Sequence, residues 1–277
     1  MTTHLRARLD EQVRALVENQ EIAKADTDPE GVHQVRVAVR RLRAVLKAGV
    51  SDAGKLRDEL KWLGGELGPV RDLDVVLGYF RGQTAGFDAR ELAAVDRLLA
   101  PLAADRERAR KRMVKALRSK RYAALLVALT AASTSPQVVV PTKKEPDLTG
   151  VIVRPLRKLR ELAATMDADA TDDELHELRL RGKRLRYAAE LAESTGGKSL
   201  RRLIKASRAL QEVLGDHQDA VVAEDRVRTL LTATTDPEEA FVAGRLVERE
   251  QARQAATRST WRAAYLDVDA AADKVLS

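Results

Sequence analysis

The stretch HQVRVAVRRLRAVLK, residues 33–47, has the spacing of an α-helix that is apolar on one face and cationic on the next. At 100° per residue the cations fall within about 80° of arc, directly beside the apolar face. Such a helix buries its apolar face in a core and leaves a row of positive charge along the edge of that core. The apolar face holds Val32, Val35, Val39, Leu42 and Leu46, and the cationic face holds His33, Arg36, Arg40, Arg43 and Lys47.

Much of this stretch occurs a second time in HELRLRGKRLRYAAE, residues 176–190. Two further blocks repeat in the same order and at nearly the same offset. LGPVRDLDVV (67–76) matches LGDHQDAVVA (214–223), and ALRSKRYAAL (116–125) resembles ATRSTWRAAY (256–265). Three blocks in one order predict an internal duplication, with a bundle of about four helices in each half. The second cationic stripe holds His176, Arg179, Lys183 and Arg186, beside Leu175, Leu178, Leu185 and Ala189.

Composition supports an all-α fold class. The chain has 277 residues, 44% of them hydrophobic but only 3% aromatic, so its core consists mainly of Leu, Val and Ala, which suit packed helices. The segment STSPQVVVPTKKEPDLTG, residues 133–150, contains three prolines and few helix formers. We therefore predict a first helical bundle over 1–132, a proline-rich linker over 133–150 and a second bundle over 151–277.

Several classes of protein are excluded or disfavoured. The chain has no cysteine, which rules out disulfides and thiolate metal sites or nucleophiles. Its N-terminus is charged throughout, and no stretch approaches 18 uncharged apolar residues, so neither a signal peptide nor a membrane span is expected. The default expectation is a cytoplasmic protein without a membrane partner.

The charge pattern predicts an anionic partner. Net charge is +7 and the sequence pI is about 9.7. Each like-charged neighbour pair on a helix lowers the stability of that helix by about 0.2–0.5 kcal/mol. The stripes are therefore unfavourable unless an anion binds to them. The alternative is that they are solvated faces, or that they pair with the chain's own carboxylates. A third stripe with the same spacing holds Arg108, Lys111, Lys115 and Arg118, and weaker candidates on the next helix of each half are Lys61, Arg201, Lys205 and Arg208.

The histidines that lead the two stripes have three possible roles. His33 and His176 could contact an anion directly, pack near a helix start, or hold a metal together with nearby aspartates. Asp72 and Asp219 are interpreted first as partners that fix the arginines. The DHQD sequence at 216–219 is only weak support for a metal-dependent phosphohydrolase, and we predict no metal site and no cofactor.

Four motifs taken together resemble the CHAD domain, the conserved histidine α-helical domain. They are His-x-x-Arg-Val-x-x-Arg-Arg-Leu-Arg at 33–43, Leu-His-x-Leu-Arg-x-x-x-Lys-Arg-Leu-Arg-Tyr at 175–187, and the Leu-Gly-x-x-x-Asp elements at 67–72 and 214–219. The resemblance covers about residues 5–270. Two departures weaken the second stripe: Gly182 stands where Val39 does in the first, and Glu190 stands where Lys47 does.

This resemblance implies two four-helix bundles related by a pseudo-twofold axis around a basic central cavity. It also implies binding of inorganic polyphosphate and location on polyphosphate granules. The ligand contacts it implies are His33, Arg36, Arg40, Arg43, His176, Arg179, Lys183 and Arg186. Many members carry a triphosphate-processing CYTH domain, for which this chain has no room, so we expect a standalone, non-enzymatic binding protein. Nucleic-acid binding and a metal-dependent phosphohydrolase are the alternatives, the first disfavoured by the low aromatic content.

Overall fold

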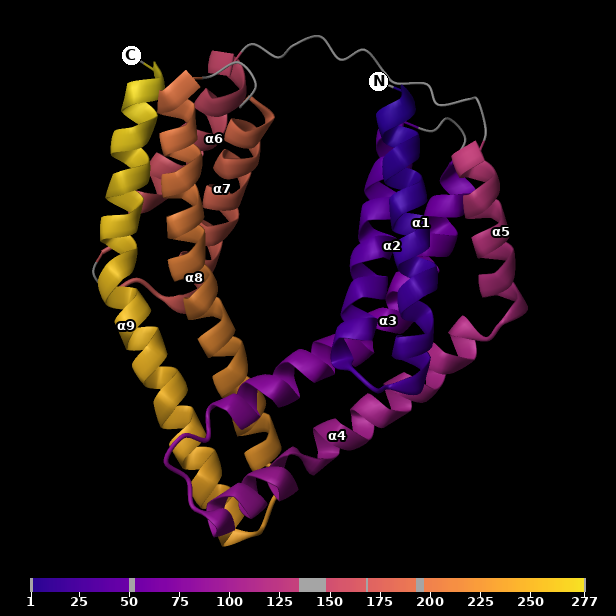
Figure 1. Ribbon diagram of the computed structural model, residues 1–277. Helices are drawn as coiled ribbons and strands as arrows, with labels where there is room; N and C mark the ends of the chain where they lie inside the picture. Colours follow the sequence, from indigo (N-terminus) through magenta and orange to yellow (C-terminus); the bar gives the residue numbers. More distant parts are fainter. Residues whose placement is uncertain (1, 50–52, 135–147, 168, 193–196, 277) are drawn as a thin grey trace. The chain divides into compact units, whose positions relative to one another are not determined.

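The computed structural model describes residues 2–49, 53–134, 148–167, 169–192 and 197–276. Every regular element in these ranges is an α-helix, which confirms the predicted all-α fold class (Figure 1). The chain divides into two compact units, residues 1–142 and 143–277. Of the predicted linker, residues 133–134 and 148–150 are helical and the rest lies outside the described residues. None of the described helices is long and apolar enough to cross a membrane.

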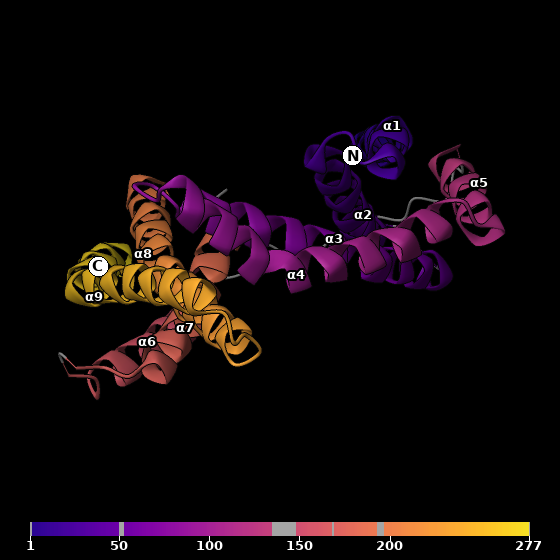
Figure 2. The same ribbon diagram turned by 90° about the horizontal axis from the view of Figure 1, so that it is seen from below.

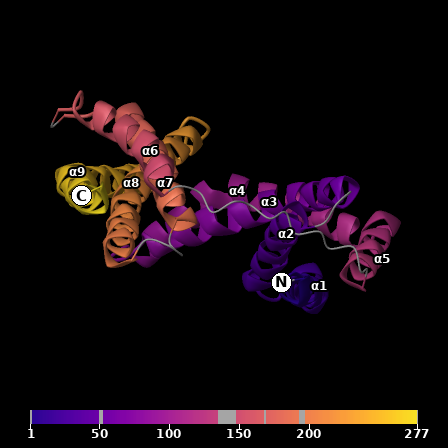
Figure 3. The same ribbon diagram turned by 90° about the horizontal axis from the view of Figure 1, so that it is seen from above.

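The helices of both units follow the order of the repeated sequence blocks. The first unit holds α1 (Thr2–Ala25), α2 (Pro29–Gly49), α3 (Gly54–Gly82), α4 (Ala89–Leu117) and α5 (Lys120–Thr134), and the second holds α6 (Leu148–Ala163), α7 (Asp172–Leu191), α8 (Gly197–Leu231) and α9 (Pro237–Leu276). In the first unit α1 and α2 lie side by side (Figures 1 and 3). In the second, α8 and α9 form a long hairpin (Figures 1 and 2).

One break in the chain gives the first unit its fifth helix. The repeated block that lies inside α9 is divided between α4 and α5 in the first unit. There the hydroxyl of Ser119 accepts a hydrogen bond from the backbone N–H of Tyr122 at 3.1 Å and so caps the start of α5. At the matching Ser259 the helix continues, and the hydroxyl donates to the Ala256 carbonyl, just as the Ser119 hydroxyl donates to the Ala116 carbonyl. The α4–α5 pair of the first unit therefore corresponds to the single helix α9 of the second.

Capping side chains mark the starts of three helices. The Asp28 carboxylate accepts from the Glu30 backbone N–H at 2.8 Å, immediately before Pro29 opens α2. Thr171 and Glu174 form the reciprocal capping box that begins α7. The Asp236 carboxylate accepts from the Glu238 backbone N–H at 2.8 Å at the start of α9. These caps define where the three helices begin.

Both predicted apolar faces lie in a hydrophobic core. Residues Val32, Val35, Val39, Leu42 and Leu46 of α2 are at most 1% exposed, and Leu175, Leu178, Leu185 and Ala189 of α7 are at most 2% exposed. Each face packs within its own unit. Because a cationic residue follows or precedes nearly every buried position, burial of these faces places the charged stripes at the edge of each core.

An ion-pair network joins three segments of the first unit. The guanidinium of Arg106 on α4 donates two hydrogen bonds to Asp26, at 2.7 and 2.6 Å, and its Nε lies 2.5 Å from the Asp74 carboxylate on α3. Asp26 ends α1 in the left-handed region with φ of 58°, which Asp tolerates better than most side chains. The hydrogen bond from Arg106, together with its positive charge, holds the pKa of Asp26 below its ordinary value of 3.8.

We predict that Asp26→Asn lowers the free energy of unfolding by about 2 kcal/mol near neutral pH, because it removes a charge-assisted contact and keeps the backbone conformation. A carboxyl group with a lowered folded-state pKa stabilises the fold above its ordinary pKa, and this contribution is lost as the pH falls. Urea unfolding from about pH 7 to pH 2 should therefore show the variant and the wild type converging in acid. Asp10→Asn, an exposed site on α1, is the control. A difference that stays constant with pH would contradict this assignment.

Candidate functional site

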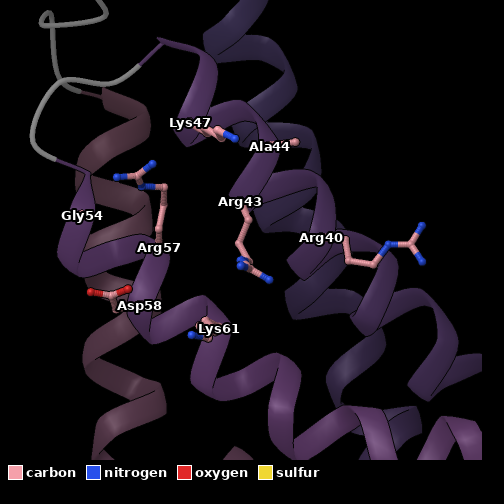
Figure 4. Close-up of a pocket in the computed structure, with 8 residues that line it drawn as sticks. All are labelled: Arg40, Arg43, Ala44, Lys47, Gly54, Arg57, Asp58 and Lys61. Carbon is pink, nitrogen blue, oxygen red and sulfur yellow. The ribbon is translucent and has the colours of Figure 1, made fainter. Parts of the chain in front are cut away.

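The cationic stripe of α2 borders a basic groove between α2 and α3. The groove has a volume of about 520 Å³. Five basic side chains and a single acidic one line it, so it carries a strong positive charge. The lining residues are Arg40, Arg43, Ala44, Lys47, Gly54, Arg57, Asp58 and Lys61 (Figure 4).

The side chains of the groove do not all point the same way. Figure 4 shows Arg43 extending from α2 into the space beside α3, whereas Arg40 points away from it. Arg57 stands on the opposite wall, and its Nε is buried without a hydrogen-bond partner among the described residues. A buried donor without a partner is costly.

Sequence reasoning missed Arg57. The signal was present, because Arg57 and Lys61 are separated by four residues and so share a face of α3. The adjacent Asp58 and Glu59 obscured it. In the structure Glu59 faces another way and pairs with Arg121 of α5 at 2.6 Å, so only Asp58 of these two acidic residues remains beside the groove.

The Leu-Gly-x-x-x-Asp element of α3 holds Arg36, a half-buried member of the stripe. Leu67 is buried in the core. A Cβ atom at Gly68 would lie 2.9 Å from Nη1 of Arg36, so the guanidinium occupies the space that only glycine leaves. Four residues later, Asp72 lies 3.4 Å from Nη2 of the same guanidinium. The motif therefore makes room for the arginine and pairs with it.

The second unit repeats part of this arrangement. A Cβ atom at Gly215 would lie 3.9 Å from Nε of Arg179, which aligns with Arg36 in the repeated sequence blocks. Asp219 is exposed and makes no ion pair with Arg179 among the described residues. The Nε groups of Arg179 and Arg186 are instead buried without a hydrogen-bond partner within the described part of the chain. The second stripe thus contains two unsatisfied donors.

His176 is oriented by a neighbour on α8. Its Nδ1 lies 2.6 Å from the amide oxygen of Gln218. A carbonyl oxygen only accepts, so Nδ1 carries the proton and donates it, and Nε2 is left for another partner. The matching position on α3 is Arg71, so His33 cannot make the same bond.

His217 of the DHQD sequence has a structural role. It is 2% exposed. Its Nε2 lies 2.8 Å from the Asp172 carboxylate and its Nδ1 lies 3.1 Å from the Thr257 hydroxyl, so it ties α8 to the start of α7 and to α9. Arg258 also contacts Asp172. In the described ranges, no three His, Cys, Asp or Glu side chains lie close enough together to hold a metal ion.

Glu190 makes the two stripes unequal. It lies 3.0 Å from Arg208 of α8 and 3.9 Å from Nε of Arg186. The matching residues of the first unit are Arg43, Lys47 and Lys61, which all line the groove. One carboxylate therefore bridges two cations in the second unit, at the place where the first unit has a third cation.

Six further predicted residues are exposed and lie outside the α2–α3 groove. On α4, Arg108 pairs with Asp105, and Lys111 lies 4.0 Å from Glu107. This stripe is thus partly neutralised by its own helix. Lys115 on α4, Arg118 directly after α4, and Arg201 and Lys205 on α8 are exposed.

The chain is similar to known proteins along most of its length. The family model of the CHAD domain matches residues 7–228. Two uncharacterized proteins of Mycobacterium tuberculosis, from strains CDC 1551 / Oshkosh and H37Rv, are 30% identical over 280 residues, which cover 96% of this chain and 53% of each relative. The chain thus spans about half the length of these curated relatives.

Two solved structures have a similar fold. The crystal structure of the CHAD domain from the plant Ricinus communis matches with a TM-score of 0.59 and 31% identity, over 95% of this chain and 91% of that one. PptA from Streptomyces chartreusis matches with a TM-score of 0.56 and 20% identity, over 96% and 99%, and at this identity the likeness shows the fold alone. The protein is therefore an all-helical one with cationic helices beside its cores. It belongs to the CHAD domain family, as its motifs predict.

We predict that Gly68→Ala weakens binding of inorganic polyphosphate about tenfold, because the added Cβ displaces the Arg36 guanidinium without changing net charge. Gly64→Ala on the same helix is the matched control, since its Cβ would lie 3.7 Å from Val39, an ordinary contact. Isothermal titration calorimetry measures both variants. Equal affinities of the two would show that the position of Arg36 is unimportant for binding.

Proposed function

We propose that this protein binds inorganic polyphosphate through the cationic stripes of α2 and α7, without catalysing a reaction. The groove between α2 and α3 is the observation that carries the proposal, because five basic side chains and one acidic one surround about 520 Å³. The family to which the chain belongs is associated with polyphosphate. By the same proposal the protein is located on polyphosphate granules.

The chemistry of the stripes suits a polymer of phosphates. Arginine donates several hydrogen bonds from a planar group and contacts more than one phosphate oxygen, whereas lysine supplies a point charge. The groove offers both kinds of side chain. Binding by many such contacts releases counterions and weakens steeply as salt rises.

A nucleic acid is the second candidate, and one observation favours it. Tyr187 is 51% exposed, and the cations of Lys183 and Arg186 lie over its ring at 5.7 and 5.1 Å. An exposed aromatic ring between cations can stack on a base. Competition separates the two ligands: polyphosphate binding that resists RNA or DNA at equal phosphate concentration supports the first proposal, and displacement supports the second.

We predict that Arg36→Glu combined with Arg179→Glu weakens binding of long-chain polyphosphate by about a hundredfold or more, because two charge-assisted contacts become repulsive. Arg8→Glu combined with Arg226→Glu changes net charge equally at exposed positions on α1 and α8, and is the control. Filter binding at several salt concentrations measures affinity, and circular dichroism verifies folding. A folded double variant with wild-type affinity would rule out the proposed function.

We also predict that Glu190→Lys strengthens polyphosphate binding, by roughly tenfold, because it removes the carboxylate that bridges Arg186 and Arg208. The substitution gives the second stripe the cation that the first has at Lys47. Glu248→Lys, at an exposed position on α9, changes net charge by the same amount and should have a smaller effect. Equal gains from the two variants would indicate a general charge effect only.

A further inference from the structure

We propose that the second unit holds a separate site for a compact phosphoryl anion, either orthophosphate or pyrophosphate, between α6 and α7. A cavity of about 140 Å³ lies there, lined by Arg154, Pro155, Lys158, Arg181 and Arg184. Four of the five lining residues are basic, and none of them belongs to the stripes that carry the proposed function.

The cavity lies on the opposite side of α7 from its cationic stripe. At 100° per residue, Arg181 and Arg184 are rotated by about 200° and 140° from Arg179. An anion bound between α6 and α7 would therefore not contact the stripe. The duplication does not repeat this arrangement either, because Ala38 stands where Arg181 does.

Arg181 is held in place by contacts on one side. Its Nε donates to the Glu177 carboxylate at 2.8 Å, and its Nη1 donates to the backbone carbonyl of Lys158 at 2.7 Å. These two bonds fix the plane of the guanidinium across the gap between the helices. Its Nη2 has no hydrogen-bond partner among the described residues. A fixed guanidinium loses little freedom when it binds an anion.

Three of the four cations of the cavity lack acidic partners among the described residues, whereas the other two arginines in the same part of α6 have them. On α6, Arg157 lies 3.7 Å from Glu161, and Arg160 pairs with Asp269 and Asp273 of α9 at 2.5 and 2.6 Å; neither arginine lines the cavity.

By contrast, Arg154, Lys158 and Arg184 make no ion pair with any described residue. Glu177 is the one carboxylate that pairs with a lining side chain in the described part of the chain, and it is already bound to Arg181. The hydrogen bond from Arg181 and the charges of Arg181 and Arg184 lower the pKa of Glu177, so it stays ionised and an excess of about three positive charges remains.

The size of the cavity selects the class of ligand. A volume of 140 Å³ admits one or two phosphoryl groups, whereas the α2–α3 groove is more than three times larger. Arginines and a lysine on two helices can surround the oxygens of a small tetrahedral anion from several directions. The cavity therefore fits a free small anion better than a segment of a long polymer.

Calorimetric titration of the full chain with pyrophosphate, and separately with orthophosphate, tests the site. We expect Arg154→Ala combined with Arg184→Ala to weaken binding of the preferred anion at least tenfold, and Arg157→Ala, which lies on α6 outside the cavity, to leave it unchanged. Lys158→Ala is a second, single-site variant. Circular dichroism verifies that each variant folds.

A groove variant, Arg43→Ala combined with Lys61→Ala, separates this site from the proposed function. In that background, we expect binding of the small anion to persist with a stoichiometry of one while polyphosphate affinity falls. Loss of small-anion binding in the groove variant, or its retention in the Arg154→Ala, Arg184→Ala variant, would overturn the inference. The inference would also be overturned if neither anion gave measurable heat when titrated into the wild-type protein and neither shifted its melting temperature.

Discussion

Burial of one helix face next to a row of like charges is the constraint on which this protein depends. The apolar side of α2 is at most 1% exposed, so its position is fixed by the core. Arg36 then has to lie at the edge of that core, half-buried, where a cation without a partner is costly. Two residues of α3 offset this cost: Gly68 leaves space for the guanidinium, and the carboxylate of Asp72 supplies the opposite charge. The cations that line the α2–α3 groove have a single acidic residue, Asp58, among them.

The fold was largely predictable because periodicity reports burial directly. Valines and leucines at 3–4 residue spacing identified the core faces of α2 and α7. The division of the last helix of the first unit into α4 and α5 was not predictable in this way. The same Arg-Ser pair lies within the continuous helix α9 at 258–259 and directly before α5 at 118–119. The residues around the pair, and not the pair itself, therefore decide whether the helix breaks there.

The candidate site was predictable only in part. The spacing of residues along the sequence shows which of them share one face of a helix, but not which side chains of other helices they contact. The stripe on α2 was found, but Arg57 on the facing helix was not, since acidic neighbours in sequence concealed it. Asp72 lies beside its expected arginine, whereas Asp219 makes no such pair among the described residues. Glu190 was visible as a departure from the first repeat. Its contacts with two cations, Arg186 and Arg208, depend on side-chain positions that no periodicity encodes.

The bond between His176 and Gln218 decides which ring nitrogen is turned toward other partners. Nδ1 donates its proton to the Gln218 amide oxygen, so Nε2 is the nitrogen left for a further contact. In the first repeated block Arg71 stands at the position of Gln218, and a guanidinium has no acceptor to offer. The two histidines that open the repeated helices therefore differ in how their rings are oriented, although their sequence positions match.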